Sequence, residues 1–435
     1  LPTATPRPAF GPVQGSWSAV PGLQRLTGSV VIAQSSPNVV YETVPTQSDA
    51  APTVGQSVAL RRSDNDGGSW RTLATPRPTN SAVASWTPTN VLVSPADPNV
   101  VAITVVAVMS YNVPKPCPAD LTLAYTPPAS GTATAGKTLS DALPLNGFAT
   151  CSAQYLSTDG GVHWTKIAFT GVQPSADGLQ SLAEQPGHLY STMYSDDQQG
   201  PVAGYRLLSG LGGASWQPID AALRAQGRHI CGFVAVPMDT TLYAETTSEK
   251  CYSYTTHPEE LWRSDDAGAT WRDIGSLTGQ LSVLGAAEEG PYDAQPTLYV
   301  YTVSQPDLYA LHLEVSTDGG YSWQSAPSAG IPTGFTPVLH MTGMLSDGSL
   351  VAEFSPNPQA GPNTPVTIGF YAWHAGDSAW HQVAPAISIP SIDGLSNAQD
   401  QFLATPSGGV HGTIWHTQFN PLLRTGSFSV ERYSL

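Results

Sequence analysis

Seven acidic residues near the ends of predicted strands are of the type that could perform hydrolysis. Two carboxylates that face each other across a cleft, one of them kept protonated by its surroundings, can cleave a glycosidic bond. The spacing of these residues does not bring any particular two together, and most are expected to be solvated loop residues of an acidic protein. They are Asp177, Asp196, Asp197, Asp239, Glu245, Asp293 and Asp393.

Other patterns that support catalysis or metal binding are weak in this sequence. It contains no HExxH, CxxC, Gly-x-Ser-x-Gly or Walker-type loop. His411 and His416 are the closest histidine pair, and their spacing on a strand places them on opposite faces. We therefore predict neither a metal site nor a cofactor.

A repeated motif shows which elements must carry any site. The pattern Ser-x-Asp-x-Gly-x-x-Trp occurs at 63–70, 157–164, 264–271 and 316–323, with degenerate copies at 209–216 and 374–380. The closing tryptophans are 94, 52, 55, 52 and 57 residues apart. A period near 50 residues with apolar strand patterns throughout predicts blades of four strands each, as in a β-propeller.

The blade count follows from the motifs and the two chain ends. The 94-residue spacing is interpreted as one blade with an insertion at about 110–150. Residues 398–431 supply three strands, and the segment 15–20 is expected to add the fourth, which would close the ring and remove open sheet edges. The predicted fold is all-β, a single seven-bladed propeller over residues 15–435, with six or eight blades as the fallback counts.

The repeats resemble the Asp-box (BNR) motif of sialidase-like β-propellers. The resemblance spans nearly the whole chain and implies a propeller fold, but such propellers include both glycosidases and binding proteins. Because the motif recurs in blade after blade, we assign it a structural role. Carboxylates accept hydrogen bonds in the turn, glycines adopt positive φ and tryptophans fill space between blades. The assigned residues are Ser63, Asp64, Gly67, Trp70, Ser157, Asp159, Gly161, Trp164, Trp216, Ser264, Asp265, Gly268, Trp271, Ser316, Asp318, Gly320, Trp323 and Trp380.

The resemblance also implies what an enzyme of this type would need. Sialidases use three arginines, a Tyr–Glu pair, an Asp and an Arg-Ile-Pro motif, and this last motif is missing here. Arg62 and Arg263 precede boxes and Arg71 and Arg272 follow them, which indicates structural roles. Endoglucanase-like relatives build their cleft from two propellers, and one is predicted here. Enzymatic activity is therefore not favoured, with a glycoside hydrolase as the alternative. The remaining candidate carboxylate binders are Arg25, Arg206, Arg224, Arg228 and Arg424.

Composition indicates the compartment and excludes some partners. Only 11% of the 435 residues are charged, with a net charge of −16 and no basic run, which argues against nucleic acid or an anionic membrane as the partner. Residues 1–14 are interpreted as the end of a Thr/Pro-rich linker, so we expect an exported, bacterial protein, extracellular or tethered to a cell surface. Four cysteines allow three pairings; Cys117–Cys151 and Cys231–Cys251 are predicted, and four buried thiols are the alternative.

The expected recognition face is the rim opposite the boxes. Antiparallel blades place the box turns on one rim and the long connections, including 110–150 and 246–258, on the other. Exposed aromatic residues there would stack on sugars or anchor a protein, although they could equally pack the insertions down. The predicted function is a binding or structural module with a glycan or protein ligand, and self-association into an extracellular assembly is the further expectation. The candidate residues are Tyr111, Tyr252, Tyr254, His257, Tyr301 and Tyr309.

Overall fold

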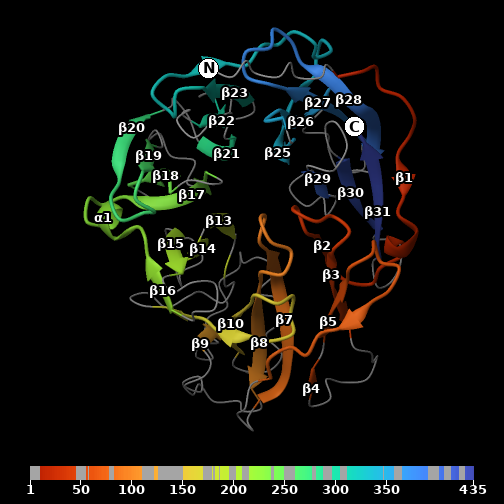
Figure 1. The fold of residues 1–435 in the computed structure, drawn as a ribbon, viewed down its shortest axis with the longest axis vertical. Coiled ribbons are helices and arrows are strands. Elements are labelled where there is room, and N and C mark those ends of the chain that lie inside the picture. The colour runs from red at the N-terminus through yellow and green to blue at the C-terminus, as the bar shows by residue number, and fades with distance from the viewer. Residues whose placement is uncertain are drawn as a thin grey trace, which may run out of the picture. The chain divides into compact units, whose positions relative to one another are not determined.

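In the part of the chain that the structure describes, the fold consists of short β-strands with one α-helix, α1 (Ala221–Arg224), and one 3-10 helix, η1 (Pro21–Leu23) (Figure 1). The prediction of an all-β chain is confirmed. The chain comprises two compact units: unit 1 is Leu1–Leu26, Asp66–Gly68 and Ala222–Leu435, and unit 2 is Thr27–Asn65 and Ser69–Ala221. This computed structural model describes residues 10–45, 55–56, 58–77, 83–109, 122–125, 150–169, 179, 182–185, 187–194, 202–207, 215–236, 240–248, 260–276, 281–287, 296–303, 311–345, 347–356, 365–389, 401–405, 413–420 and 427–435.

Unit 2 contains three antiparallel four-stranded meanders, in which each strand pairs with the next. The first comprises β2 (Val30–Ile32), β3 (Val40–Pro45), β5 (Val58–Ser63) and β6 (Arg71–Thr72). The second comprises β7 (Val83–Val93), β8 (Val101–Met109), β10 (Thr150–Ser157) and β11 (Thr165–Lys166). The third comprises β13 (Ala183–Gln185), β14 (His188–Tyr194), β15 (Val202–Leu207) and β16 (Ser215–Pro218).

Three short strands extend these meanders. In the predicted insertion, β9 (Thr122–Tyr125) pairs with β10, so part of the insertion adds a strand to the sheet of the second meander. β4 (Gly55–Gln56) runs parallel to β7, and β12 (Ala168–Phe169) runs parallel to β16.

Unit 1 contains four meanders of the same kind. The first comprises β17 (His229–Ala235), β18 (Leu242–Thr247), β19 (Glu260–Ser264) and β20 (Arg272–Ser276), and the second comprises β21 (Leu281–Ala287), β22 (Thr297–Val303), β23 (Leu311–Ser316) and β24 (Gln324–Ser325). The third comprises β25 (Thr336–Met344), β26 (Leu350–Ser355), β27 (Val366–Trp373) and β28 (His381–Ile389). The fourth comprises β29 (Gln401–Thr405), β30 (Thr413–Asn420), β31 (Ser427–Ser434) and β1 (Ser18–Ala19).

The last meander joins the two ends of the chain. Ser18 pairs with Arg432 and Ala19 with Glu431, so the N-terminal strand completes the C-terminal sheet, as the sequence predicted. Residues of the predicted linker also belong to this unit, since Phe10 and Val13 pack against its core. Trp17 lies between the rings of Phe370, His416 and Tyr433, and its indole N–H donates to the carbonyl of Pro385 at 3.0 Å.

The predicted number of seven separate blades needs correction. The strands of the described residues form six hydrogen-bonded sheets, the lower of the two fallback counts. Four of the six have four strands each, and the largest has nine, because that sheet takes in more than one meander. The repeating unit is nevertheless the four-stranded meander of a β-propeller.

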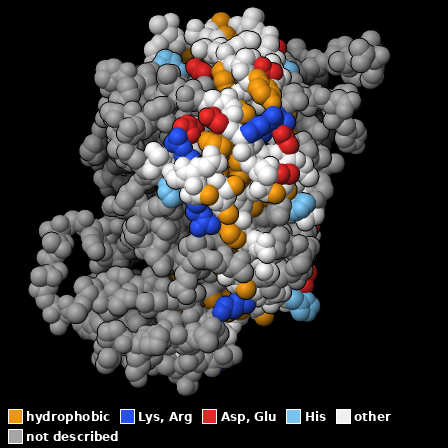
Figure 2. Space-filling model, turned by 90° about the vertical axis from the view of Figure 1, so that its left-hand side faces the viewer, with side chains coloured by type: hydrophobic (Ala, Val, Ile, Leu, Met, Phe, Trp, Pro, Cys, Tyr) orange, Lys and Arg blue, Asp and Glu red, His pale blue; other side chains and the backbone are white. Residues whose placement is uncertain are grey.

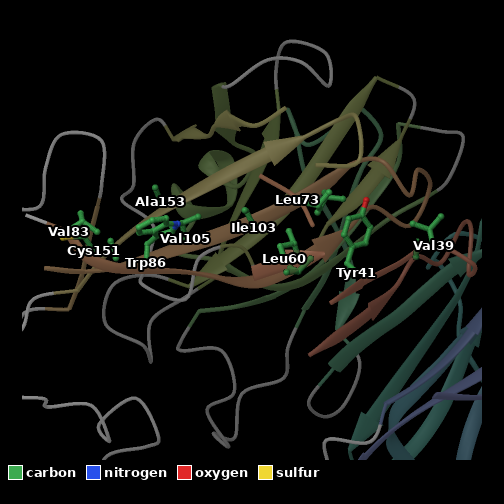
Figure 3. Packing of buried hydrophobic residues seen from close by; sticks show 14 residues of the cluster. Val39, Tyr41, Leu60, Leu73, Val83, Trp86, Ile103, Val105, Cys151 and Ala153 are labelled. Carbon is green, nitrogen blue, oxygen red and sulfur yellow. The ribbon is translucent and has the colours of Figure 1, made fainter. Parts of the chain in front are cut away.

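The core of unit 2 shows why an apolar run becomes a central strand. In β8, Val101, Ile103, Val105 and Ala107 pack into one buried cluster, with Leu60 of β5 and Ala153 of β10 (Figure 3). Ala102, which points to the other face, belongs to a second cluster with Trp216. Both faces of β8 are therefore buried, and alternation with polar residues is lost.

Candidate functional site

Three of the described boxes form a turn that is closed by the box's own serine and carboxylate. The Ser157 hydroxyl donates to Asp159 at 2.8 Å and accepts from the Gly161 N–H at 2.7 Å. Asp159 in turn accepts from the backbone N–H of His163 at 2.9 Å. Ser264 and Ser316 begin boxes with the same bonds. The structural assignment of these serines therefore rests on a repeated set of contacts.

The glycine at the fifth box position is required by both conformation and space. Gly320 has φ +95°, and a Cβ there would lie 2.4 Å from Cδ1 of Ile274. Gly161 has φ +86°, and a Cβ there would lie 2.5 Å from Cδ1 of Leu73. A side chain at either position would force the box away from the blade on which it packs.

Two of the predicted box carboxylates are not the ones that close the turn. In the first box Asn65, not Asp64, takes the hydrogen bond from Ser63 at 3.0 Å and that from the Ser69 N–H at 2.8 Å. In the third complete box Asp266, not Asp265, takes the corresponding bonds from Ser264 and the Thr270 N–H, both at 2.8 Å. Counting from the serine shows why, since the third position of the motif is residue 65 in one box and 266 in the other.

Asp64 instead joins two arginines of unit 2. Arg62, which is 6% exposed, donates from Nε to Asp64 at 2.6 Å, and Arg71 lies 3.9 Å from the other carboxylate oxygen. Arg62 also donates to the Tyr41 hydroxyl at 2.8 Å, and Arg71 donates to the Gly160 carbonyl at 3.0 Å. The group links the first meander to the box of the second.

Unit 1 repeats this arrangement. Arg263 donates from Nε to Asp265 at 2.6 Å, and Arg272 lies 3.0 Å from its second oxygen. The guanidinium of Arg263 lies over the ring of Tyr243 at 5.5 Å, and the Tyr243 hydroxyl donates to the Gly319 carbonyl at 3.1 Å. The sequence prediction that these arginines have structural roles is in line with these contacts.

A buried ion pair lies next to the first box. Glu42 is fully buried on β3, and its carboxylate accepts from Nε of Arg61, on β5, at 2.6 Å and from the Thr27 N–H at 3.2 Å. The Arg61 guanidinium also lies 4.5 Å from the ring centre of Trp70. Burial raises the pKa of Glu42, and Arg61 acts in the opposite direction.

The carboxylates that close the box turns have lowered pKa values. Burial acts to raise the pKa of Asp159 and of Asp318, but the hydrogen bonds that each receives outweigh it and hold both pKa values at about 2. Asp266 has a lowered pKa for the same reasons. These groups act as hydrogen-bond acceptors in the ionised form at neutral pH.

We expect these carboxylates to make the fold acid-sensitive. Their pKa values are below the value of about 3.9 in an unfolded chain, so their contribution is present above pH 4 and is lost as the pH falls towards 2. In the variant Asp159→Asn/Asp318→Asn the urea midpoint should fall less steeply between pH 4 and pH 2 than in the wild type. Asparagine is a suitable replacement because Asn65 holds this position in the first box. An unchanged slope would show that other groups cause the acid sensitivity.

A group of polar residues lies where β17 and β19 pair with Thr247 and Thr246 of β18, at the end of this meander opposite its box. Arg228, just before β17, lies 2.6 Å from Oε1 of Glu260, and the Trp262 indole N–H donates to Oε2 at 3.1 Å. His229 is the first residue of β17. Burial lowers the pKa of its imidazole, and the positive charge of Arg224 lowers it further, so the imidazole is neutral at neutral pH. We call Arg224, Arg228, His229, Glu260 and Trp262 the β17 rim group.

Of the predicted rim residues, only Tyr301 lies on a described strand, β22, where it pairs with Ser282 and Leu313. The candidate recognition residues Tyr111, Tyr252, Tyr254, His257 and Tyr309 lie outside the described residues. So do Cys117 and Cys251, and the two disulfide pairings remain predictions; neither described cysteine, Cys151 or Cys231, is a free thiol.

The structure describes four of the five candidate arginines. Arg224 and Arg228 belong to the β17 rim group, whereas the backbone N–H of Arg25 donates to the Ser429 hydroxyl at 3.3 Å. Arg206 lies on β15, opposite Tyr190, and Arg424 lies outside the described residues. Of the seven candidate acids, Glu245 is described, and it is buried on β18. Within the described part of the chain, no set of three or more metal-binding side chains comes together and no helix has the length and hydropathy to span a membrane.

The sequence analysis did not identify Glu260, Trp262 and His229 as site residues. Glu260 follows the 246–258 connection directly, whereas Arg228 and His229 lie at the start of β17, which meets the other end of that connection only through the pairing of His229 with Thr247. The roles of Asn65 and Asp266 were also missed, and counting residues from the serine of each box would have found both.

Comparisons with known proteins give structural similarity only. No protein-family model matches the chain, and no curated protein matches it. A YCF48 structure with a bound D1 peptide is 11% identical, with a TM-score of 0.46 over 100% of both chains. An ulvan lyase is 8% identical, with a TM-score of 0.42 over 97% of this chain and 94% of its own. A leech intramolecular trans-sialidase is 12% identical, with a TM-score of 0.35 over 99% of this chain and 70% of its own. All three TM-scores are below 0.5, so these similarities establish no activity, ligand or partner for this chain.

Proposed function

We propose that this chain is a binding module of the Asp-box propeller type, with the β17 rim group at its recognition surface. The observation that supports this most directly is the Arg228–Glu260–Trp262 arrangement. Both carboxylate oxygens of Glu260 are held by fixed donors, and the Arg228 side chain remains 28% exposed. A ligand would meet hydrogen-bonding groups that are already oriented, which lowers the entropy cost of binding.

The ligand is proposed to be a glycan or a protein. Arg228 offers a planar set of N–H donors, and neutral His229 offers one donor and one acceptor. The predicted aromatic residues of the neighbouring connection, Tyr252 and Tyr254, would add stacking surface on the same rim.

The proposed place of action is the cell surface or the extracellular space. A low content of charged residues, a Thr/Pro-rich N-terminal segment and the predicted disulfides support it. Self-association into an extracellular assembly is part of the same proposal.

A glycan microarray with the purified chain would test recognition at this rim. We expect Arg228→Ala to weaken binding at least tenfold, because it removes the donors and leaves Glu260 without its cation. Lys166→Ala, at an exposed position of β11, should bind as the wild type does. Light scattering of the same samples reports self-association.

Three results would contradict the proposal. Equal binding by the wild type and Arg228→Ala would show that the β17 rim group does not bind the ligand. Detection of cleaved glycan by mass spectrometry would show that the chain is a glycoside hydrolase, the alternative function, and not only a binding module. A chain that binds no glycan and stays monomeric would refute both the glycan ligand and the assembly.

A further inference from the structure

A tyrosine on the box rim of unit 1 is strongly exposed. Tyr321, at the sixth position of its box, is 57% exposed. The Arg272 guanidinium carbon lies 5.4 Å from its ring centre, and Arg272 is paired with Asp265 at 3.0 Å. The side chains of Arg272 and Asp265 are themselves about half exposed. We call these three residues the Tyr321 platform.

Neighbouring residues hold Asp265 and the backbone of Tyr321 in place. Asp265 is held by Nε of Arg263, whose side chain is 8% exposed and which lies over the buried ring of Tyr243. The backbone on both sides of Tyr321 is fixed as well, since Gly320 N–H donates to Ser316 at 2.8 Å and Ser322 N–H donates to Asp318 at 2.9 Å. The exposed groups therefore lose little freedom when a ligand binds.

These three side chains together suit one class of ligand. The face of a sugar ring carries apolar C–H groups that pack on an aromatic ring, and its hydroxyl groups both donate and accept hydrogen bonds. Tyr321 supplies the ring, Arg272 supplies N–H donors and Asp265 supplies acceptor oxygens. Asp265 is shared by Arg272 and the buried Arg263, so the exposed Arg272 is already paired with a carboxylate and a charged ligand is not required. We propose that the Tyr321 platform is a binding site for a neutral carbohydrate chain, separate from the β17 rim group and independent of its proposed function.

The surroundings favour a sugar over a protein partner. A stable protein interface buries about 800 Å² on each side, with a largely apolar centre. Among the residues that the structure describes, the large hydrophobic side chains that are exposed are Val162 and Tyr321. Figure 2 shows, on the face that it views, acidic and basic side chains beside one another with hydrophobic ones between them. One exposed ring with a flanking ion pair matches the size of a single sugar unit.

Unit 2 provides a matched control. Val162 holds the sixth position of its box and is 53% exposed, and Asp64 and Arg71 correspond to Asp265 and Arg272. The charged groups are thus repeated, but the aromatic ring is replaced by an aliphatic side chain. The platform in unit 1 differs at the residue on which a sugar would stack.

Saturation-transfer NMR with four neutral hexasaccharides, cello-, manno-, laminari- and chitohexaose, would test the site. We expect at least one to bind with a Kd on the order of 1 mM, as suits a single stacking residue. Tyr321→Ala should weaken that binding at least tenfold, Tyr321→Phe should retain it because the ring stays, and Val162→Ala should leave it unchanged.

The same measurements can overturn the proposal. Absence of binding by all four sugars at about 10 mM would do so, as would equal binding by the wild type and Tyr321→Ala. Loss of binding in Arg228→Ala together with full binding in Tyr321→Ala would place the sugar at the β17 rim group instead. Circular dichroism of each variant establishes that it is folded.

Discussion

Replacing Arg61 with methionine is expected to lower the free energy of unfolding by about 3 kcal/mol at pH 8, because it leaves the buried Glu42 without its cation. This is near the lower end of the range for breaking a buried pair, since the Arg61 side chain is itself 30% exposed. Loss of the contact with Trp70 adds to the effect.

The effect of Arg61→Met should depend on pH in a defined direction. Burial already raises the pKa of Glu42, and removal of Arg61 raises it further. A carboxyl group whose folded pKa exceeds its unfolded value of about 4.3 contributes stability below that value and loses it as the pH rises through the folded pKa. The variant should therefore lose less stability at pH 5 than at pH 8, as measured by urea unfolding monitored by tryptophan fluorescence.

The double variant Glu42→Gln/Arg61→Met separates charge from packing. Glutamine keeps an acceptor for the Thr27 N–H but does not ionise, so this variant should recover most of the stability and show no added pH dependence. Equal losses at pH 5 and pH 8 in Arg61→Met, or no recovery in the double variant, would show that the buried charge is not the cause.

The second large effect is expected at Trp17. Trp17→Ala should cost about 3 kcal/mol, because the ring lies among Phe370, His416 and Tyr433 and its removal leaves a cavity. Trp17→Phe should cost about 1 kcal/mol, since it keeps an aromatic ring and loses the hydrogen bond to Pro385.

Ser16→Ala is the control, at an exposed neighbouring position, and its stability should lie within about 0.5 kcal/mol of the wild type. Thermal and urea unfolding of the three variants give the comparison. If Trp17→Ala is as stable as Ser16→Ala, the N-terminal segment does not contribute to the stability of unit 1.

The sequence predicted the repeated elements well and their polar contacts less well. Box spacing and the apolar strand runs gave the four-stranded meanders, and the assignment of 15–20 as the missing fourth strand gave the pairing of β1 with β31. The role of Asp265 was missed because its neighbour Asp266 is chemically identical and only the register of the turn distinguishes them. The group of Arg228 and Glu260 depends on pairing between distant strands, which periodicity does not encode.

The contact between the chain ends has a consequence for the order of events during synthesis. Gln14 and Tyr433, joined by the hydrogen bonds of the Tyr433 hydroxyl, are 419 residues apart in sequence. Strand β1 must therefore wait for β31, which is synthesised much later, before it has a partner, and closing so long a loop is entropically costly. This sheet is complete only after β31 has left the ribosome, and a chain that stops before β31 lacks the pairing with β1.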